Sequence, residues 1–332
     1  MRRGCRILLW GSLFLLVMTV FVLFFARRAL TPLNTGKTID FEVREGETFS
    51  EAGNRLQKEG IIRSALGLKI LVRTAGRDRD LKHGIYEVSS NMRPAEIIKK
   101  LINGEVKSVW VTFPEGITAE EMGGILEKKK IMSQKDFVFE AKNYETSIEE
   151  EYFKGLEGLL YPDTYNVATN ITPSQMAELM LDQFESRAVP LYRARKQPYK
   201  LSLRDSVVLA SLIEREASLP GELPVMAGVY MNRLKTGMLL NCDATIQYAL
   251  GGRKAELTYK DLEIDSPYNT YKHSGLPPGP IGNPGLDALK AAFRPAAVPY
   301  YYYVLNWKAN DGSHTFTKDY QEHLKAIRES NQ

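Results

Sequence analysis

The chain has 332 residues, of which 44% are hydrophobic and 25% are charged. This composition is typical of a folded protein of about two domains, and it excludes a disordered or collagen-like chain. Residues 1–28 carry five arginines and no acidic residue, which leaves 39 basic and 40 acidic side chains in residues 29–332. Because the bulk of the chain has no positive excess to hold a nucleic-acid backbone, we expect no nucleic-acid partner.

The first predicted element is an uncharged run of 20 residues, residues 7–26, with the sequence ILLWGSLFLLVMTVFVLFFA. A helix of about 20 apolar residues crosses a membrane, whereas a cleaved signal peptide has a shorter apolar region of about 7–15 residues. Arg27 and Arg28 follow the run directly. We therefore expect an uncleaved, single-pass signal anchor. Three arginines before the run and two after it give a small positive-inside bias toward a cytoplasmic N-terminus at residues 1–6.

The two cysteines fit this topology. Cys5 would lie on the cytoplasmic side and Cys242 on the other side, so they would not pair, and a domain of this size folds without disulfides. As a nucleophile, Cys242 would need an activating base, and no neighbour in the sequence suggests one. A buried thiol without a chemical role is the favoured interpretation of Cys242.

After a short linker at residues 27–38, the chain contains a repeat. Residues 45–62 and 115–132 are identical at eight of 18 aligned positions, with an offset of 70 residues. A short strand is predicted before each copy, and Glu-Gly makes the turn that follows it. Two unrelated strand–turn–helix units could also match by chance, but eight identities favour a true repeat.

Each copy then begins a helix with a capping box. Thr48 with Glu51, and Thr118 with Glu121, have the Ser/Thr-x-x-Glu spacing in which two side chains satisfy the first free N–H groups. Between the copies we predict a strand at 83–88 and a helix that starts at 93–95 and ends before Gly104. These small units resemble LysM modules, which bind N-acetylated glycans. The predicted subdomain covers residues 39–105, and a purely structural spacer is an equal alternative.

Residues 134–200 are predicted to be mostly helical, with a break at 155–165. The helix that carries the main candidate follows at 201–217, with Ser202 or Asp205 as its cap. Its apolar residues at 208, 209, 212 and 213 form a stripe with helical spacing. Glu216 falls inside this stripe, whereas Glu214 lies about 200° from Leu212 and faces the other side.

A carboxyl group against apolar neighbours loses hydration, which raises its pKa. A glutamic acid that is still protonated near neutral pH can donate a proton and take it back. Glu216 is therefore a candidate general acid and base. The alternative is a glutamate at a helix end that reaches solvent or pairs with an arginine.

Downstream, loops stiffened by Pro and Gly carry Tyr, Asn and Thr at residues 241–248, 266–272 and 275–285. Such side chains offer stacking surfaces and hydrogen bonds that suit a saccharide groove, although turns alone could explain the composition. Residues 300–304 (YYYYV) are predicted to form a strand with its rings in the core. The four histidines show no paired metal-ligand spacing, and the glycine pairs lack a phosphate-loop pattern, so we expect no metal or cofactor.

Several motifs occur in order along the chain. They are LEGLLYPDTY (156–165), ASLIERE (210–216), VYMNRL (229–234), DAT (243–245), YNTY (268–271), GLPPG (275–279), NPG (283–285) and HTF (314–316). With these motifs in this order, the chain closely resembles the YceG-like family of endolytic murein transglycosylases. Ala244 stands where family members often have proline, and Cys242 where Ser or Thr is usual.

The resemblance implies an α+β fold: an N-terminal transmembrane helix, a small LysM-like β/α subdomain, and a larger mixed α+β catalytic domain at residues 106–332. It implies that Glu216 is catalytic, cutting between N-acetylmuramic acid and N-acetylglucosamine to leave a 1,6-anhydro end. Supporting or substrate-binding roles are expected for Glu222, Asp243, Thr245, Tyr268, Asn269 and Tyr271.

The implied partners are peptidoglycan glycan strands and penicillin-binding peptidoglycan synthases. The implied location is the bacterial cytoplasmic (inner) membrane, with the catalytic domain outside the cytoplasm. There the enzyme would cut nascent strands and so end their elongation. Two alternatives remain open at this point: a muramidase-type hydrolase, which normally needs a second carboxylate, and a non-catalytic, membrane-anchored glycan-binding protein.

Overall fold

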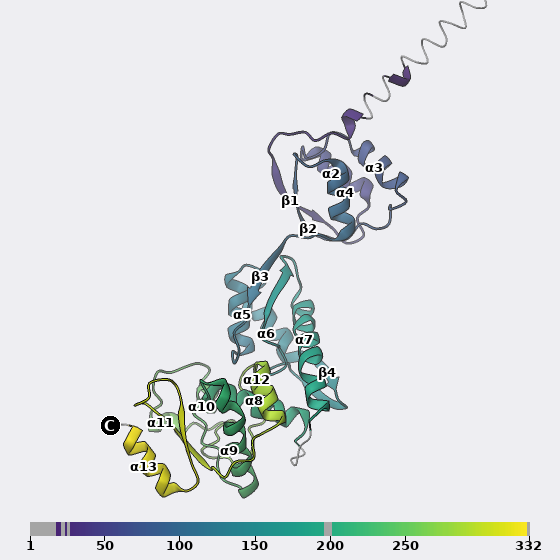
Figure 1. Cartoon of the computed structure of the whole chain (residues 1–332). Coiled ribbons are helices and arrows are strands. Elements are labelled where there is room, and N and C mark those ends of the chain that lie inside the picture. The colour runs from purple at the N-terminus through teal and green to yellow at the C-terminus, as the bar shows by residue number, and fades with distance from the viewer. Residues whose placement is uncertain (1–17, 21–23, 25–26, 196–200, 331–332) are drawn as a thin grey trace, which may run out of the picture. The chain divides into compact units, whose positions relative to one another are not determined.

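The computed structural model describes residues 18–20, 24, 27–195 and 201–330, and its fold is mixed α+β (Figure 1). The chain contacts divide it into two compact units. Unit 1 is residues 1–109 with 166–170, and unit 2 is residues 110–165 with 171–332. Most of the predicted anchor at 7–26 lies outside the described residues, and within the described part of the chain no helix is long and apolar enough to span a membrane.

Unit 1 is built on one antiparallel pair of strands. Its elements are β1 (Thr38–Val43), α2 (Phe49–Lys58), α3 (Ala65–Thr74), β2 (Gly84–Ser89) and α4 (Pro94–Asn103). The register runs from Thr38 opposite Ser89 to Val43 opposite Gly84. The strands and helices enclose one core, in which Phe41, Leu56 and Tyr86 are fully or almost fully buried. The strands at 39–43 and 83–88 and the helix ending before Gly104 are confirmed to within a residue or two.

The capping signals explain why the repeated helices start where they do. Thr48 and Thr118 each accept a hydrogen bond from the N–H three residues on, and the Glu51 and Glu121 carboxylates each accept one from the backbone N–H of the cap residue. Both capping boxes predicted from the sequence are therefore present. Each is preceded by a glycine with positive φ, 74° in the first copy and 75° in the second, a conformation that a residue with Cβ rarely adopts.

The first part of unit 2 contains more strand than the sequence predicts for residues 134–200. Its elements include α5 (Ala119–Lys128), α6 (Gln134–Asn143), β4 (Glu145–Ile148), β5 (Glu151–Lys154) and α7 (Pro173–Arg193), while β3 (Ser108–Thr112) pairs with β6 (Thr164–Ala168). Residues 134–200 are thus not mostly helical, because three short strands lie between α6 and α7. Strands of four or five residues are too short to show a clear alternation of apolar and polar positions.

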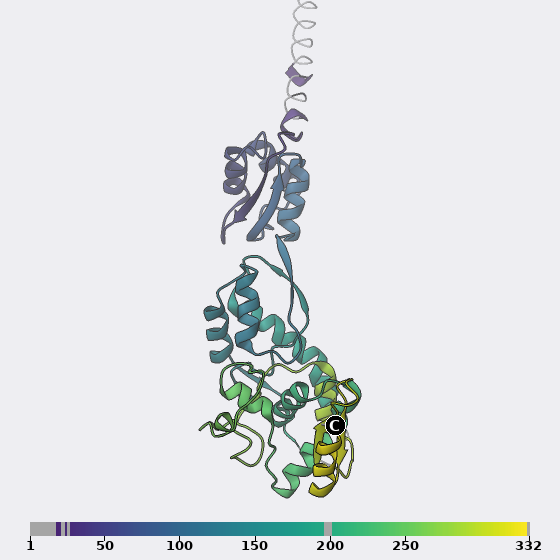
Figure 2. The same ribbon diagram turned by 90° about the vertical axis from the view of Figure 1, so that its left-hand side faces the viewer.

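The remaining elements of unit 2 follow helix α8 (Leu203–Glu216) along the chain, and Figures 1 and 2 show the ribbon from two sides. They are η1 (Pro220–Glu222), α9 (Leu223–Thr236), α10 (Asp243–Ala249), α11 (Tyr259–Leu262), α12 (Leu286–Phe293), β7 (Tyr302–Leu305), β8 (His314–Thr317) and α13 (Tyr320–Ser330). Helix α8 packs against α9, α10 and α12. The predicted stripe is therefore wrong in extent: residues 206–213 are all buried, on every face of the helix.

Candidate active site

Glu216 is the last residue of α8, and its carboxyl group meets three donors from two other segments. The Cys242 thiol donates to Oε1 at 3.1 Å, and the Ala244 N–H donates to the same oxygen at 3.4 Å. The Tyr303 hydroxyl donates to Oε2 at 3.0 Å. Helix α10 and strand β7 thus hold the carboxyl group at the end of α8, and no guanidinium is among its partners in the described part of the chain.

Two opposing effects set the proton affinity of this carboxyl group. Burial raises the pKa of Glu216 above its ordinary value, and the negative charge of Asp243 raises it further. The hydrogen bonds from Cys242, Tyr303 and Ala244 stabilise the ionised form and lower the pKa in part. A carboxyl group with this balance holds a proton more tightly than a free glutamate and is still stabilised after it releases the proton.

The hydroxyl groups of two tyrosines extend the network. Tyr230 on α9 and Tyr303 on β7 share a hydrogen bond of 2.8 Å, and their rings meet edge to face with centroids 6.1 Å apart. Burial raises the pKa of both hydroxyls well above the ordinary value. Both phenols therefore stay neutral, so Tyr303 keeps the proton that it donates to Glu216.

Glu222 fixes the strand next to Tyr303. Its two carboxylate oxygens accept from His314, Oε1 from the backbone N–H at 2.8 Å and Oε2 from Nδ1 at 2.7 Å. The His314 ring meets the Tyr303 ring edge to face at 5.8 Å. Glu222 thus braces β8 by tying it to η1, and β8 pairs with β7, the strand that carries the Tyr303 hydroxyl.

We expect Glu222→Ala to lower the free energy of unfolding by about 2–3 kcal/mol, because two hydrogen bonds to a shielded carboxylate are lost. Urea denaturation measures the change. Glu263→Ala is the matched control, since Glu263 pairs with Lys272 at an exposed site and such pairs contribute about 0–1 kcal/mol. Equal losses in both variants would contradict the brace.

The other five predicted supporting residues form two pairs and one separate residue, Tyr268. Asp243 and Tyr271 lie near Glu216: the Tyr271 hydroxyl donates to the exposed Asp243 carboxylate. Thr245 and Asn269 are fully buried and hold the backbone. Thr245 donates to the Cys242 carbonyl, and the Asn269 side-chain amide donates to the Leu262 carbonyl at the end of α11 and to the Ile264 carbonyl just after it. Tyr268 packs on Tyr248, with ring centroids 4.9 Å apart.

Glu214 does face away from Glu216, but it is not a solvent-facing residue. Its Oε2 accepts from the Gly285 N–H at 3.0 Å, and burial raises its pKa to about 7. A raised pKa alone therefore does not single out Glu216 on this helix. The difference between the two glutamates is the set of donors, because only Glu216 contacts the thiol and the tyrosine hydroxyl.

Three residues of this network were missed from the sequence: Cys242, Tyr230 and Tyr303. Cys242 is buried, as predicted, but it contacts Glu216 directly, so the interpretation of a thiol without a role is incomplete. Tyr303 stood out only as one of four consecutive tyrosines, which indicated a strand. The strand predicted at 300–304 is confirmed in part, as β7 at 302–305, and Tyr303 and its neighbours are half-buried rather than in the core. Within the described residues, no group of His, Cys, Asp or Glu could hold a metal ion.

An enclosed carboxyl group with a raised pKa among neutral donors can release a proton and take it back, which is what general acid–base chemistry requires of a side chain. Comparison with known proteins agrees with the resemblance seen in the sequence: the model of the YceG-like family matches residues 41–329. The chain belongs to the YceG-like family.

Two relatives of the chain are both named endolytic murein transglycosylase. The chain is 32% identical over 306 residues to the endolytic murein transglycosylase of Bacillus subtilis, covering 87% of this chain and 84% of that protein. It is 26% identical over 328 residues to the endolytic murein transglycosylase of Streptococcus pneumoniae, covering 89% of this chain and 59% of that protein. A crystal structure of a yceG-like protein from Listeria monocytogenes superposes with a TM-score of 0.59 at 31% identity, over 88% of this chain and 99% of that one.

Proposed function

We propose that this protein is an endolytic lytic transglycosylase that cuts peptidoglycan glycan strands, with Glu216 as its catalytic acid and base. The observation that supports this most directly is the enclosure of the Glu216 carboxyl group among Cys242, Tyr303 and Ala244, with its pKa raised by burial. Two relatives named as endolytic murein transglycosylases support the reaction class.

The proposed reaction uses one carboxyl group twice. Protonated Glu216 gives its proton to the oxygen that links C1 of N-acetylmuramic acid to the next N-acetylglucosamine, and that C–O bond breaks. Positive charge develops at C1 and the adjacent ring oxygen. Ionised Glu216 then removes the proton from the C6 hydroxyl of the same sugar, whose oxygen bonds to C1. The product is a 1,6-anhydro sugar, Glu216 has regained its proton, and no water is consumed.

The donors around Glu216 match both halves of this cycle. Before the bond breaks, burial favours the protonated acid. After proton transfer, the thiol, the tyrosine hydroxyl and the Ala244 N–H stabilise the carboxylate. Glu216 as a residue is half-buried, while its carboxyl group is enclosed by these donors.

A change at Cys242 should shift the pH dependence of the reaction. The Cys242 hydrogen bond lowers the pKa of Glu216, so its loss in Cys242→Ala raises that pKa further. The active form is protonated and is lost as the pH rises through this pKa. We therefore expect the alkaline limb of the kcat/KM profile to move to higher pH in Cys242→Ala, while Cys242→Ser, which keeps a donor, leaves it closer to the parent. A shift to lower pH would contradict this assignment.

The hydrolase alternative depends on Asp243. A hydrolase would use a second carboxylate to activate water, and Asp243 is close enough to Glu216 to raise its pKa. However, the Asp243 carboxylate accepts the Tyr271 hydroxyl, so we favour the transglycosylase. Mass spectrometry of digested peptidoglycan separates the two, because a transglycosylase leaves anhydro ends and a hydrolase leaves reducing ends. If the protein is a non-catalytic binder, neither product forms.

The domain boundaries, the location and the cellular partners complete this proposal. We assign residues 106–332 to the catalytic domain, 39–105 to a LysM-like subdomain, and 7–26 to an anchor that keeps the enzyme at the outer face of the cytoplasmic membrane. Nascent strands made by penicillin-binding synthases would then be within reach. The test is the distribution of glycan chain lengths in cells that lack the protein: longer strands are expected, and an unchanged distribution counts against the role.

A further inference from the structure

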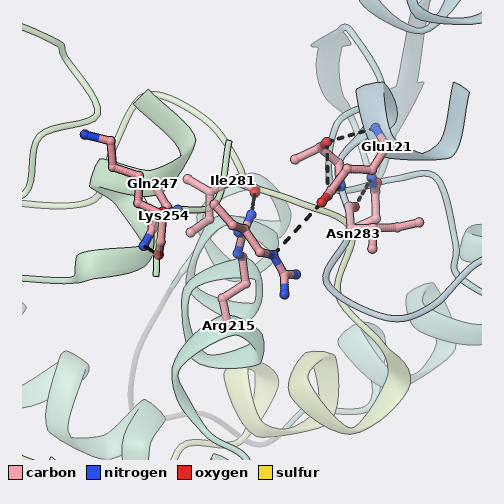
Figure 3. Close-up of polar contacts among 9 residues, drawn as sticks. Glu121, Arg215, Gln247, Lys254, Ile281 and Asn283 are labelled. Carbon is pink, nitrogen blue, oxygen red and sulfur yellow. Dashed lines mark hydrogen bonds and ion pairs between the residues drawn. The ribbon is translucent and has the colours of Figure 1, made fainter. Parts of the chain in front are cut away.

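A second feature of unit 2 lies beside Glu216 and is not used by the proposed reaction. It is a cavity of about 740 Å³, lined by residues from the start of α5, the end of α8, helix α10 and the loops at 251–253 and 278–280. Arg215 lines it, whereas Glu216 does not. Figure 3 shows Arg215 between Gln247 of α10 and Glu121 of α5. A volume of this size accommodates a ligand of several sugar or amino-acid units.

Arg215 is half-buried in this cavity without a carboxylate partner. Its Nη1 donates to the Ile281 carbonyl at 3.1 Å, and no ion pair joins it to any carboxylate among the described residues. Burial lowers the pKa of Arg215, and the neighbouring charge of Arg253 lowers it further. A buried guanidinium with one neutral acceptor has lost solvation that an anionic ligand would replace.

Glu121 and Glu157 both act on Arg215 through their charge, but neither forms an ion pair with it in the described part of the chain. Glu121 lies 4.0 Å from the Arg253 guanidinium, in a loose contact at the rim. Glu157 is enclosed and accepts from the Ala119 N–H and the Asn283 amide, and burial raises its pKa to about 7. At neutral pH Glu157 is therefore ionised only in part, and the cavity keeps an excess of positive charge beside Arg215.

The rest of the lining defines the class of ligand. Tyr248 and Tyr268 form an aromatic wall. Toward α5, α6 and β5 the lining carries charges of both signs, Glu120 and Glu121 on α5, Lys142 on α6 and Lys154 on β5. A neutral oligosaccharide would leave these groups unused. A short peptide with a carboxylate and an ammonium group would pair with Arg215 and Arg253 through its carboxylate, and with Glu120, beside Lys142, through its ammonium group.

We propose that this cavity binds the peptide stem of the peptidoglycan strand whose sugar lies at Glu216. The proposal rests on the proposed function. Two helices connect Glu216 to the cavity. On α8, Arg215 of the cavity lining directly precedes Glu216. On α10, Ala244 contacts Glu216, and Tyr248, one turn later, lines the cavity. One helical turn is about 5.4 Å, a distance that a substituent on the bound sugar spans. Substrates with stems are then bound more tightly than bare strands.

The test measures binding by the full-length Glu216→Gln protein, which leaves the probes uncut. The probes are a tetrasaccharide from digested peptidoglycan with its stem peptides, and the same tetrasaccharide after an amidase has removed them. We expect the stem-bearing probe to bind at least about tenfold more tightly. Arg253→Gln, at the exposed rim where folding is not at risk, and Arg215→Gln should each bring the ratio of the two affinities close to one. Arg328→Gln, an exposed arginine on α13, should keep the ratio of the parent protein.

Equal affinity for both probes in the parent protein would overturn the proposal, and so would a ratio that persists in both cavity variants. The first result would mean that the strand, through its sugars or its lactyl carboxylate, is the only ligand. These readouts do not depend on turnover. If the wild-type protein cut neither probe, the proposed function would fail, whereas the affinity ratio would still report on the cavity.

Discussion

Glu216→Gln is expected to lower the rate of strand cleavage by at least about 100-fold, since general acid–base catalysis by one side chain contributes about 10²–10⁴. The amide keeps the shape of the side chain, and its one oxygen still accepts from Cys242 and Ala244 at the Oε1 position, while its NH2 group takes the place of the oxygen that faces Tyr303. It has no carboxyl proton to give and takes none back. The measurement is the yield of anhydro ends from purified strands, followed by mass spectrometry over time.

Glu214→Gln is the matched control for this loss. Glu214 lies on the same helix, is also largely enclosed, and also has a pKa raised by burial, to about 7. Its contact is the Gly285 N–H, which a glutamine oxygen also accepts. We expect this variant to keep activity within about threefold of the wild type. If both variants lost activity equally, the effect would come from damage to α8 and not from the chemistry of Glu216.

The parts of the fold that the sequence predicted well are those with local signals. The capping boxes at Thr48 and Thr118 depend on side chains three residues apart, so the helices that follow them were found. The end of α4 at Gly104 depends on a single left-handed residue, with φ of 71°. By contrast, the burial of α8 on all sides depends on α9, α10 and α12, whose packing no local pattern encodes.

In the candidate site, too, the sequence indicates the residue with a local signal but not its partners from distant parts of the chain. The spacing along α8 and the family resemblance both indicated Glu216, and its catalytic role stays a prediction. The residues that set its proton affinity come from far along the chain, because Tyr303 is 87 residues away and Cys242 is 26 residues away. Glu222 was expected to support the site, but its partner His314, 92 residues away, was not found. Only a folded chain brings these groups together.

One buried side chain, Asn283, joins three segments of unit 2. Its Oδ1 accepts from the Gly158 and Leu160 N–H groups at 2.8 and 3.0 Å. Its Nδ2 donates to the Ile117 carbonyl at 3.0 Å and to Glu157 at 2.7 Å. Glu157 lines the cavity beside Arg215, so the asparagine links the core of the unit to the proposed binding surface.

Asn283→Ala should therefore lower the free energy of unfolding by about 3–5 kcal/mol, because it leaves several buried donors and acceptors without partners, each at a cost of about 1–3 kcal/mol. Urea unfolding of the full chain, followed by circular dichroism, measures the change. Asn143→Ala is the matched control: Asn143 is exposed, and its amide donates only to the Phe139 carbonyl one turn earlier on α6. A loss at position 283 no larger than that at 143 would contradict the role of Asn283.

Asn283→Asp tests how the stability contributed by Glu157 depends on pH. The aspartate keeps the two accepted hydrogen bonds but removes a donor from Glu157 and places a second carboxyl group beside it. The folded-state pKa of Glu157 is already raised to about 7 from 4.5, so folding favours its protonated form. That stabilisation is complete below about pH 4.5 and fades as the pH rises through 7. The variant raises this pKa further, so its loss of stability relative to the wild type should be larger at pH 8 than at pH 5. A loss that is independent of pH would show that Glu157 does not sense residue 283.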